Sequence, residues 1–312
     1  MRLREDDPVY ESAQGSKPLR SAVVGIRNLH RIGPTGVWPT LFTLGNLIAG
    51  FAAIYFAAKP LDYEGPWGWS SLTVAGALVL IGMFLDSVDG SVARLTNAVT
   101  NFGGMLDAVV DMVTFGVAPA FIILNLMSQY VGAEGTIAII SPDTGHSLGK
   151  LCWAIAAIYV SCAALRLARF AVETNGGQLG DHLFFRGLPT PGAAGSLVGL
   201  VLLHEHLMKL AAGETGTVIT WIAGAIVILI PIMSLVSSVA MVSVLPYRHL
   251  TNQYLRVRRS FGYTARVIML LCLMLWFFQE TLAVVFIAYV LSGPISLLND
   301  RARVANGEDE DL

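Results

Sequence analysis

Long runs of apolar residues alternate with short polar connections along most of this chain. Six of these runs are long enough to cross a bilayer as helices, and they cover residues 38–58, 70–94, 102–131, 151–172, 191–212 and 217–245. The connections between them contain Pro, Gly or charged residues, which end or interrupt helices. The pattern therefore predicts six membrane-spanning helices.

A further apolar region, residues 265–298, is interrupted at two places. Gln279 and Glu280 break it first, and Gly293 and Pro294 break it again. One long tilted helix or two shorter helices could cover such a region. We favour a two-helix hairpin. The expected fold is therefore all-α: a polytopic integral membrane bundle with a six-helix core and a C-terminal two-helix hairpin.

The composition excludes several other classes of protein. Of the 312 residues, 54% are hydrophobic and only 13% are charged, which is too apolar for a soluble globule. The net charge of -2 gives no reason to expect nucleic acid as a partner. The three cysteines lie in apolar stretches without paired spacing, so we expect neither disulfides nor a zinc site from them.

The positions of the cations orient the expected helices. All of the 20 Lys and Arg residues except Lys59, Lys150 and Lys209 fall on the side that also holds the N-terminus. By the positive-inside rule that side is cytoplasmic, which suits a protein of the cytoplasmic (inner) membrane. The expected organisation is a cytoplasmic tail with a possible interfacial helix, a membrane domain, a cytoplasmic loop with the C-terminal hairpin, and a second tail; these cover residues 1–34, 35–250, 251–298 and 299–312.

Four carboxylates interrupt the second and third apolar runs near the expected cytoplasmic face. Asp86 and Asp89 are spaced i,i+3, and Asp107 and Asp111 are spaced i,i+4, so each pair projects from one face of its helix. The connection between the two helices is short, which makes them antiparallel neighbours. The two pairs can therefore face each other inside the membrane boundary.

Such a cluster requires a cation. Neighbouring carboxylates repel one another and are costly within a membrane, and too few basic residues lie nearby to pair with all of them. A hard divalent ion such as Mg²⁺ or Mn²⁺ prefers oxygen ligands and keeps coordination positions open for phosphate or water. We therefore expect one or two such ions at these aspartates.

Small residues continue the face that carries the carboxylates. Gly90 and Ala93 follow the first pair of aspartates by one turn, and Gly103 opens the facing helix. Glycine destabilises a helix interior by ~1 kcal/mol relative to alanine, so a bulky ligand or tight helix packing is needed to explain it. Arg94 stands at the mouth of this groove, where it can pair with phosphate or anchor the helix at the interface. Together these residues favour a diphosphate ligand.

The spacing of these residues resembles the signature of a known family. In order, the chain has Asp86, two residues, Asp89 and Gly90, two residues, Ala93 and Arg94, eight residues, Gly103, three residues, Asp107, three residues and Asp111. This pattern is similar in full to that of the CDP-alcohol phosphatidyltransferases, which move a phosphatidyl group from a CDP-lipid to an alcohol. The segments "PTLFTLGNLIAG", "LRLARF" and "FFRGLPTPGAAG" look most similar to the branch of the family whose acceptor is L-serine.

The resemblance implies a mechanism for the site. Asp86, Asp89, Asp107 and Asp111 would hold two ions, Mg²⁺ or Mn²⁺, on the diphosphate of CDP-diacylglycerol. Asp111 would also act as the general base on the serine hydroxyl, giving phosphatidylserine and CMP. Room for the cytidine and ribose, and a contact to phosphate, would come from Gly90, Ala93, Gly103 and Arg94. The family resemblance also implies a homodimer among membrane lipids.

Further polar residues are candidates for substrate contacts. Arg166 and Arg169, spaced i,i+3 at the cytoplasmic end of the fourth helix, could grip the serine carboxylate, or could simply anchor that helix at the interface. Thr43 and Asn46, spaced i,i+3 in the first helix, could contact the CDP-lipid or serine, or could form hydrogen bonds between helices.

Two other functions remain open from the sequence. A sibling enzyme could use glycerol 3-phosphate, inositol phosphate or choline as the acceptor, although a phosphorylated acceptor should require more cations than the arginines present here. A cation transporter could use the same carboxylates as a transport site. It would then need polar residues or broken helices that reach both faces, and the carboxylates here lie toward one side.

Overall fold

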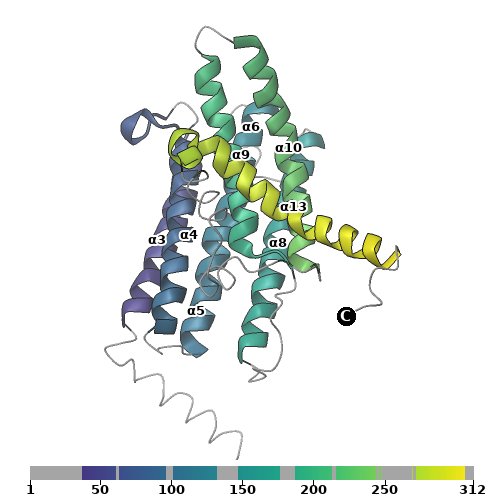
Figure 1. Ribbon diagram of the computed structural model, residues 1–312. Helices are drawn as coiled ribbons and strands as arrows, with labels where there is room; N and C mark the ends of the chain where they lie inside the picture. Colours follow the sequence, from purple (N-terminus) through teal and green to yellow (C-terminus); the bar gives the residue numbers. More distant parts are fainter. Residues whose placement is uncertain are drawn as a thin grey trace, which may run out of the picture.

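The computed structural model describes residues 37–60, 63–95, 101–131, 147–175, 187–212, 216–243, 245, 247, 269 and 272–305. Within these ranges the regular structure is helical, apart from one antiparallel bridge between Glu64 and Ser70. Figure 1 shows the helices packed side by side as a bundle. The predicted N-terminal tail with its interfacial helix, and most of the loop that follows residue 250, lie outside the described residues.

The helices follow the apolar runs of the sequence closely. They are α3 (Val37–Ala57), α4 (Ser71–Leu95), α5 (Asn101–Asp111), the π-helix η3 (Met112–Val117), α6 (Ala118–Val131), α8 (Ser147–Asn175), α9 (Thr190–Ala211), α10 (Gly216–Val242) and α13 (Phe278–Ala305), with a 3₁₀ turn η2 (Pro66–Gly68) before α4. Six segments among the described residues are long and apolar enough to cross a membrane: Thr40–Ala57, Ser71–Val92, Phe102–Ser128, Ser147–Val172, Val218–Val242 and Phe278–Leu297. The prediction of an all-α integral membrane bundle is confirmed.

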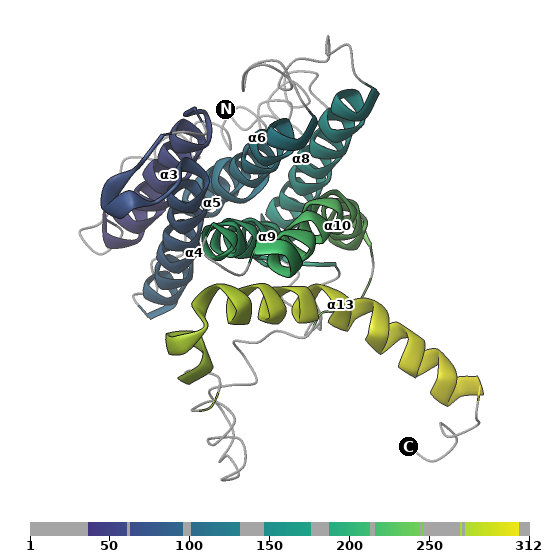
Figure 2. The ribbon, with the colours of Figure 1, turned by 90° about the horizontal axis from the view of Figure 1, so that it is seen from above.

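Helix α9 differs from the other predicted spanning helices, because it is not among those six segments. Its C-terminal half carries His204, Glu205 and His206, yet most of the helix is buried, including His204, which is 1% exposed. It packs against α4, α6, α10 and α13 (Figure 2). A helix enclosed by other helices meets side chains rather than lipid, so it can hold polar groups that a peripheral helix could not.

The C-terminal region differs from the predicted hairpin. Phe278–Ala305 form one helix, α13, that runs through Gly293 and Pro294 and lies obliquely across the bundle (Figure 1). Proline at position 294 cannot donate to the carbonyl of Val290, and the hydroxyl of Tyr247 donates to that oxygen instead, at 3.0 Å. A Cβ atom at Gly293 would lie 2.4 Å from Cζ of Tyr247. Both apparent helix breakers therefore serve the docking of Tyr247.

A row of glycines brings α13 against the centre of the bundle. Added Cβ atoms at Gly192 and Gly195 of α9 would lie 2.7 Å from Tyr289 and 2.3 Å from Phe286, and one at Gly199 would lie 3.2 Å from the Cα atom of Ala283. Small residues on one face let two helix backbones approach closely, which strengthens van der Waals packing within a membrane. The contact places Tyr289 beside the buried start of α9.

Candidate functional site

Three of the four predicted metal-binding aspartates come together in one cluster. Asp86 projects from α4, and Asp107 and Asp111 project from α5; one carboxylate oxygen of each lies within 4.8 Å of the others. Asp111 is 8% exposed, whereas Asp86 and Asp107 are half-buried. The antiparallel arrangement of α4 and α5 thus brings together carboxylates from the two aspartate pairs.

The fourth aspartate, Asp89, is 7% exposed and accepts a hydrogen bond from the Thr43 hydroxyl of α3. One turn further along α3, the Asn46 side-chain amide donates to Oδ1 of Asp111 at 3.3 Å. The polar ends of Thr43 and Asn46 therefore contact carboxylates, one on each of the two aspartate-bearing helices. These bonds hold the oxygens of Asp89 and Asp111 in fixed directions.

A π-helical turn follows Asp111 directly and was not predicted from the sequence. In η3 the Thr114 hydroxyl donates to the backbone oxygen of Asn46 at 3.1 Å. Glycines on the facing helices make this possible, because an added Cβ at Gly50 would lie 2.3 Å from Oγ1 of Thr114 and one at Gly82 would lie 2.6 Å from its Cγ2. Single π-turns occur frequently at functional sites. The glycines in two neighbouring apolar runs were the only sequence signal for this packing.

Arg166 brings a positive charge to the carboxylate cluster from α8. It is half-buried, and it lies near enough to Asp111, Asp86 and Tyr289 for their charges to act on its guanidinium. Its guanidinium donates to the hydroxyl of Thr190, a fully buried residue at the start of α9. Sequence reasoning missed Thr190 and Tyr289, which come from segments far from the aspartates in the chain. Arg169, the other predicted arginine, is exposed.

The predicted small-residue groove has open space at two of its glycines. Gly90 is exposed, and no heavy atom lies within 4 Å of a Cβ built there; the same holds at Gly104 on the facing helix. Gly103 is also exposed. The side chains of Ala93 and Arg94 lie outside the described part of the chain. A bulky ligand could therefore approach the carboxylates over Gly90 and Gly104 without displacing side chains.

The carboxylate cluster fits a hard divalent ion. Its donor atoms are oxygens only, which suits Mg²⁺ or Mn²⁺ better than softer metals. The separation of at most 4.8 Å is compatible with ligands that share one ion or bridge two ions about 4 Å apart. The site also contains a buried acceptor, Oδ1 of Asn46, that has no hydrogen-bond partner in the described structure. Asp86, Asp107 and Asp111 could thus hold a metal.

Comparisons with known proteins agree with this arrangement. Residues 37–229, more than half of the chain, match the CDP-alcohol phosphatidyltransferase family. The chain is 33% identical over 184 residues to a CDP-diacylglycerol–serine O-phosphatidyltransferase of Helicobacter pylori, which is 59% of this chain and 65% of that protein. Proteins of the same name from Bacillus subtilis and Mycobacterium tuberculosis are also similar. The first is 35% identical over 178 residues, covering 57% of this chain and 82% of that protein.

The Mycobacterium tuberculosis protein is 30% identical over 203 residues, which is 62% of this chain and 59% of that protein. The match therefore spans less than two thirds of the Helicobacter and Mycobacterium relatives. The family match over residues 37–229 includes α3, α4, α5, α8 and α9, the helices that supply the aspartates, Thr43, Asn46, Arg166 and Thr190. From the match over residues 37–229, the chain belongs to the CDP-alcohol phosphatidyltransferase family.

Proposed function

We propose that the protein transfers the phosphatidyl group of CDP-diacylglycerol to the hydroxyl of L-serine. In this reaction the serine oxygen forms a bond to the phosphorus that carries the diacylglycerol, and the bond from that phosphorus to the CMP oxygen breaks. The products are phosphatidylserine and CMP. The names of the three relatives support serine as the acceptor.

One observation carries the proposal: a cluster of carboxylates lies near a half-buried guanidinium. Asp86, Asp107 and Asp111 gather within 4.8 Å of one another, and the charge of Arg166 interacts with Asp111 and Asp86. A metal-bound diphosphate needs the carboxylates, and an amino-acid acceptor needs a cation for its own carboxylate. The two requirements are met at adjacent positions.

The aspartates have distinct roles in this proposal. Asp86, Asp89, Asp107 and Asp111 would hold two divalent ions, Mg²⁺ or Mn²⁺. Bound there, the ions would neutralise the diphosphate and stabilise the CMP leaving group. Asp111 would take the proton of the serine hydroxyl. Its hydrogen bond from Asn46 leaves the second carboxylate oxygen available for that proton.

The donor lipid would lie over the open face of α4 and α5. Gly90, Ala93 and Gly103 would leave room for the cytidine and ribose, with Arg94 near a phosphate. Thr43 and Asn46 would act on the donor through Asp89 and Asp111, whose carboxylates they contact. A direct contact of either residue with the nucleotide stays a prediction.

Arg166 is the better candidate of the two arginines for the serine carboxylate. It is half-buried near the cluster, and its hydrogen bond to Thr190 orients its guanidinium. Arg169 lies one turn further toward the end of α8 and is exposed. We propose that Arg169 has a secondary role, in drawing the acceptor toward the site.

The remaining proposals concern the setting of the reaction. The placement of Lys and Arg in the sequence supports a site that faces the cytoplasm and a location in the cytoplasmic membrane. The family resemblance supports a homodimer. Protease protection in oriented vesicles and mass photometry in nanodiscs test these two proposals.

A CMP-release assay tests the reaction. Purified protein in detergent is given CDP-diacylglycerol with Mg²⁺ or Mn²⁺ and one of L-serine, glycerol 3-phosphate, inositol phosphate or choline. We expect release with serine only, and its loss in Asp111→Asn, a variant of equal size that keeps the hydrogen bond from Asn46. Ser91→Ala, an exposed position on α4, is the matched control and should behave as wild type.

The other outcomes refute separate parts of the proposal. Release of CMP with another acceptor would be consistent with the proposed metal site but would overturn serine as the acceptor. No release with any acceptor, from protein that elutes as a single species and melts cooperatively, would overturn the transferase proposal. Uptake of divalent ions into vesicles would then favour the transporter.

A further inference from the structure

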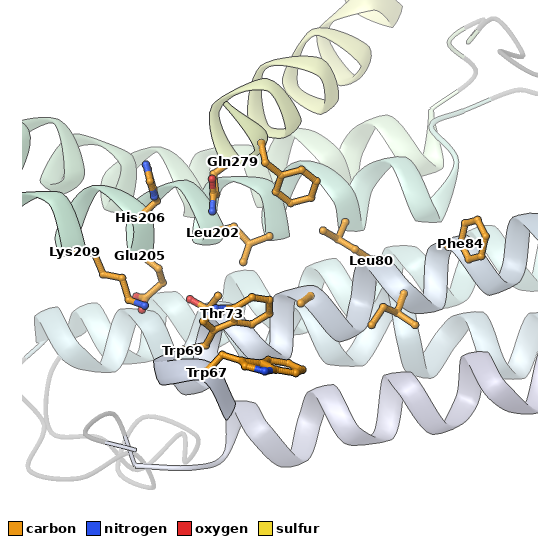
Figure 3. Close-up of a pocket in the computed structure, with 13 residues that line it drawn as sticks. Trp67, Trp69, Thr73, Leu80, Phe84, Leu202, Glu205, His206, Lys209 and Gln279 are labelled. Carbon is orange, nitrogen blue, oxygen red and sulfur yellow. The ribbon is translucent and has the colours of Figure 1, made fainter. Parts of the chain in front are cut away.

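A large cavity runs along α4 from the end of the bundle opposite the carboxylate cluster. Its volume is about 670 Å³, and its walls come from α4, from the loop before α4, from α9 and from the first turn of α13 (Figure 3). On α4 the lining runs from Thr73 to Phe84, and this helix reaches Asp86 only near its other end. From Thr73 to Asp86 the helix rises by about 20 Å. The polar end of the cavity is therefore far from the proposed reaction.

The floor of the cavity is apolar and follows one face of α4. Thr73, Ala77, Ile81 and Phe84 recur at helical spacing along it. From Thr73 to Phe84 the helix rises by about 16 Å, which matches the ~15 Å depth of one leaflet of a ~30 Å hydrocarbon core. Ile81 is 50% exposed, so the groove is open to the surroundings of the protein at this residue. These dimensions fit an acyl chain that lies along the helix.

The mouth of the cavity is polar and aromatic. Trp67 and Trp69 lie there with their ring centroids 5.5 Å apart, next to Glu205, His206 and Lys209 of α9 (Figure 3). Tryptophan and lysine are the side chains that proteins place at the boundary between hydrocarbon and headgroups. The cavity thus has an apolar part of leaflet depth and a mouth suited to a lipid headgroup.

The loop that carries the tryptophans is held in an unusual conformation. Trp67 has φ 60° and ψ 22°, a left-handed conformation that is rare for a bulky residue. Lys209 donates to the backbone oxygen of Gly68 at 3.0 Å, and the amide of Gly65 donates to the oxygen of Trp69 at 2.7 Å. These contacts fix the loop over the mouth, where Trp67 is 85% exposed.

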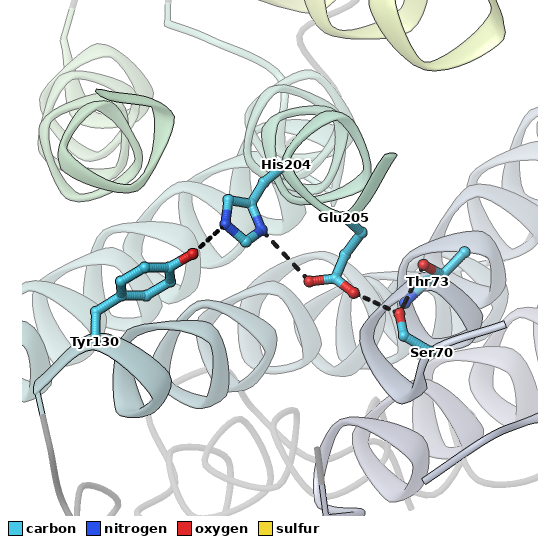
Figure 4. A network of polar contacts seen from close by, with 5 residues as sticks. All are labelled: Ser70, Thr73, Tyr130, His204 and Glu205. Carbon is cyan, nitrogen blue, oxygen red and sulfur yellow. Dashed lines mark hydrogen bonds and ion pairs between the residues drawn. The ribbon is translucent and has the colours of Figure 1, made fainter. Parts of the chain in front are cut away.

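A polar network orients Glu205 at the same place (Figure 4). Ser70 donates to Oε2 of Glu205 at 2.6 Å, and Nδ1 of the buried His204 lies 3.4 Å from Oε1. The hydroxyl of Tyr130 lies 2.6 Å from Nε2 of His204. Burial, and then the charge of Glu205, raise the pKa of Tyr130, so this hydroxyl stays protonated in its contact with the ring. The other ring nitrogen, Nδ1, faces Glu205.

The charges at the mouth distinguish between classes of headgroup. Among the described residues, Glu205 contacts a histidine and a hydroxyl rather than Lys or Arg, and Glu280 lies 3.4 Å from His206. A purely anionic headgroup would meet Lys209 but also the carboxylate of Glu205. A zwitterionic headgroup with a primary amine would offer its phosphate to Lys209 and its ammonium to Glu205 and the indole faces.

We propose that this groove binds one zwitterionic amine phospholipid from the leaflet opposite the catalytic site. The tail lies along the α4 face from Ala77 to Phe84, the phosphate pairs with Lys209, and the ammonium pairs with Glu205 beneath Trp67 and Trp69. The bound lipid links α4, α9 and α13, so it stabilises the docking of α13 on the bundle. This site is separate from the one that holds the CDP-lipid.

Native mass spectrometry tests the proposal without any reaction. Wild-type protein in detergent is mixed with phosphatidylethanolamine, phosphatidylglycerol or phosphatidylcholine that carry identical tails. We expect one retained phosphatidylethanolamine, at about five-fold or more over the other two, the selectivity that one or two exposed charge contacts provide. Glu205→Gln keeps the bond from Ser70 but removes the charge, and it should abolish the preference for the amine.

Two variants each alter one part of the groove, and a third is the control for introducing a tryptophan. Ile81→Trp fills the apolar part, and Lys209→Gln removes the phosphate contact at an exposed position. Ile228→Trp makes the same change at a 67% exposed residue of α10, outside the cavity. We expect both groove variants to lose the retained lipid about five-fold or more, whereas Ile228→Trp binds as wild type.

Three results would overturn the proposal. Equal retention of phosphatidylglycerol would exclude recognition of the amine. Equal lipid retention in Ile81→Trp and Ile228→Trp would exclude the groove. Displacement of phosphatidylethanolamine by stoichiometric CDP-diacylglycerol would assign the groove to the donor tails. None of these results depends on whether serine is the acceptor, so they leave the transferase proposal untouched.

Discussion

The position of Asp111 depends on the close packing of α3, α4 and η3, and Gly82 offers the sharpest test of that dependence. A methyl group at position 82 would lie 2.6 Å from Cγ2 of Thr114 and 2.7 Å from Oδ1 of Asn46. Ordinary contacts begin at about 3.4 Å, so in Gly82→Ala both neighbours must move by several tenths of an ångström. Asn46 donates a hydrogen bond to Asp111, and Thr114 lies three residues after Asp111 in the chain. A shift of either residue therefore acts on the position of the Asp111 carboxylate.

The expected magnitude combines two opposing effects on stability. Alanine favours the helix by ~1 kcal/mol over glycine, whereas overpacking a dense core costs ~1–3 kcal/mol. We therefore expect Gly82→Ala to lower the free energy of unfolding by only about 0–2 kcal/mol. Activity is more sensitive, because a misplacement of ~1 Å at a catalytic group can cost ~100-fold in rate. We expect kcat to fall about 10- to 100-fold.

Gly224→Ala is the matched control for this prediction. Gly224 lies in α10, and no heavy atom is within 4 Å of a Cβ built there. The variant gains helix propensity without overpacking, so its melting temperature should equal or exceed that of wild type, with unchanged CMP release. Melting in detergent and steady-state kinetics at saturating metal measure both quantities. Wild-type kcat in Gly82→Ala would refute the reasoning, because the packing would then not set the position of Asp111.

Three further changes probe other parts of the site. Thr43→Val removes the donor to Asp89, and we expect a several-fold higher Mn²⁺ concentration for half-maximal CMP release with little change at saturation; an unchanged titration would show that Thr43 does not orient a metal ligand. Arg166→Lys loses the planar donor pair, so the KM for serine should rise at least about tenfold, against about twofold or less in Arg169→Lys. Gly195→Ala pushes against Phe286, which its Cβ would meet at 2.3 Å. It should lower the melting temperature, and Phe286→Ala in the same chain should restore part of the loss; no recovery would argue against the docking of α13 on this face.

The gathering of three of the aspartates could be predicted in part from the sequence, because the geometry within each helix is local. The i,i+3 and i,i+4 spacings fix which carboxylates share a helix face. The cluster of Asp86, Asp107 and Asp111 also depends on α3, which packs against both α4 and α5. The contacts around Arg166 could not be predicted from local spacing, because Thr190 and Tyr289 come near Arg166 only through the packing of α8, α9 and α13. No periodicity within one segment reports such a contact.

The C-terminal region and α9 show how tertiary context reverses a local rule. Gly293 and Pro294 are typical helix breakers, yet α13 continues through them because Tyr247, far away in the sequence, supplies the hydrogen bond that proline cannot make. His204 of α9 is likewise acceptable in a membrane protein because it is buried among neighbouring helices and contacts Tyr130 of α6. In both places a residue that is unfavourable in its own helix allows a contact that holds a neighbouring segment in position: Tyr247 beside Pro294, and Tyr130 at His204. Substitutions there should therefore disturb the contact between helices more than the helix that carries them.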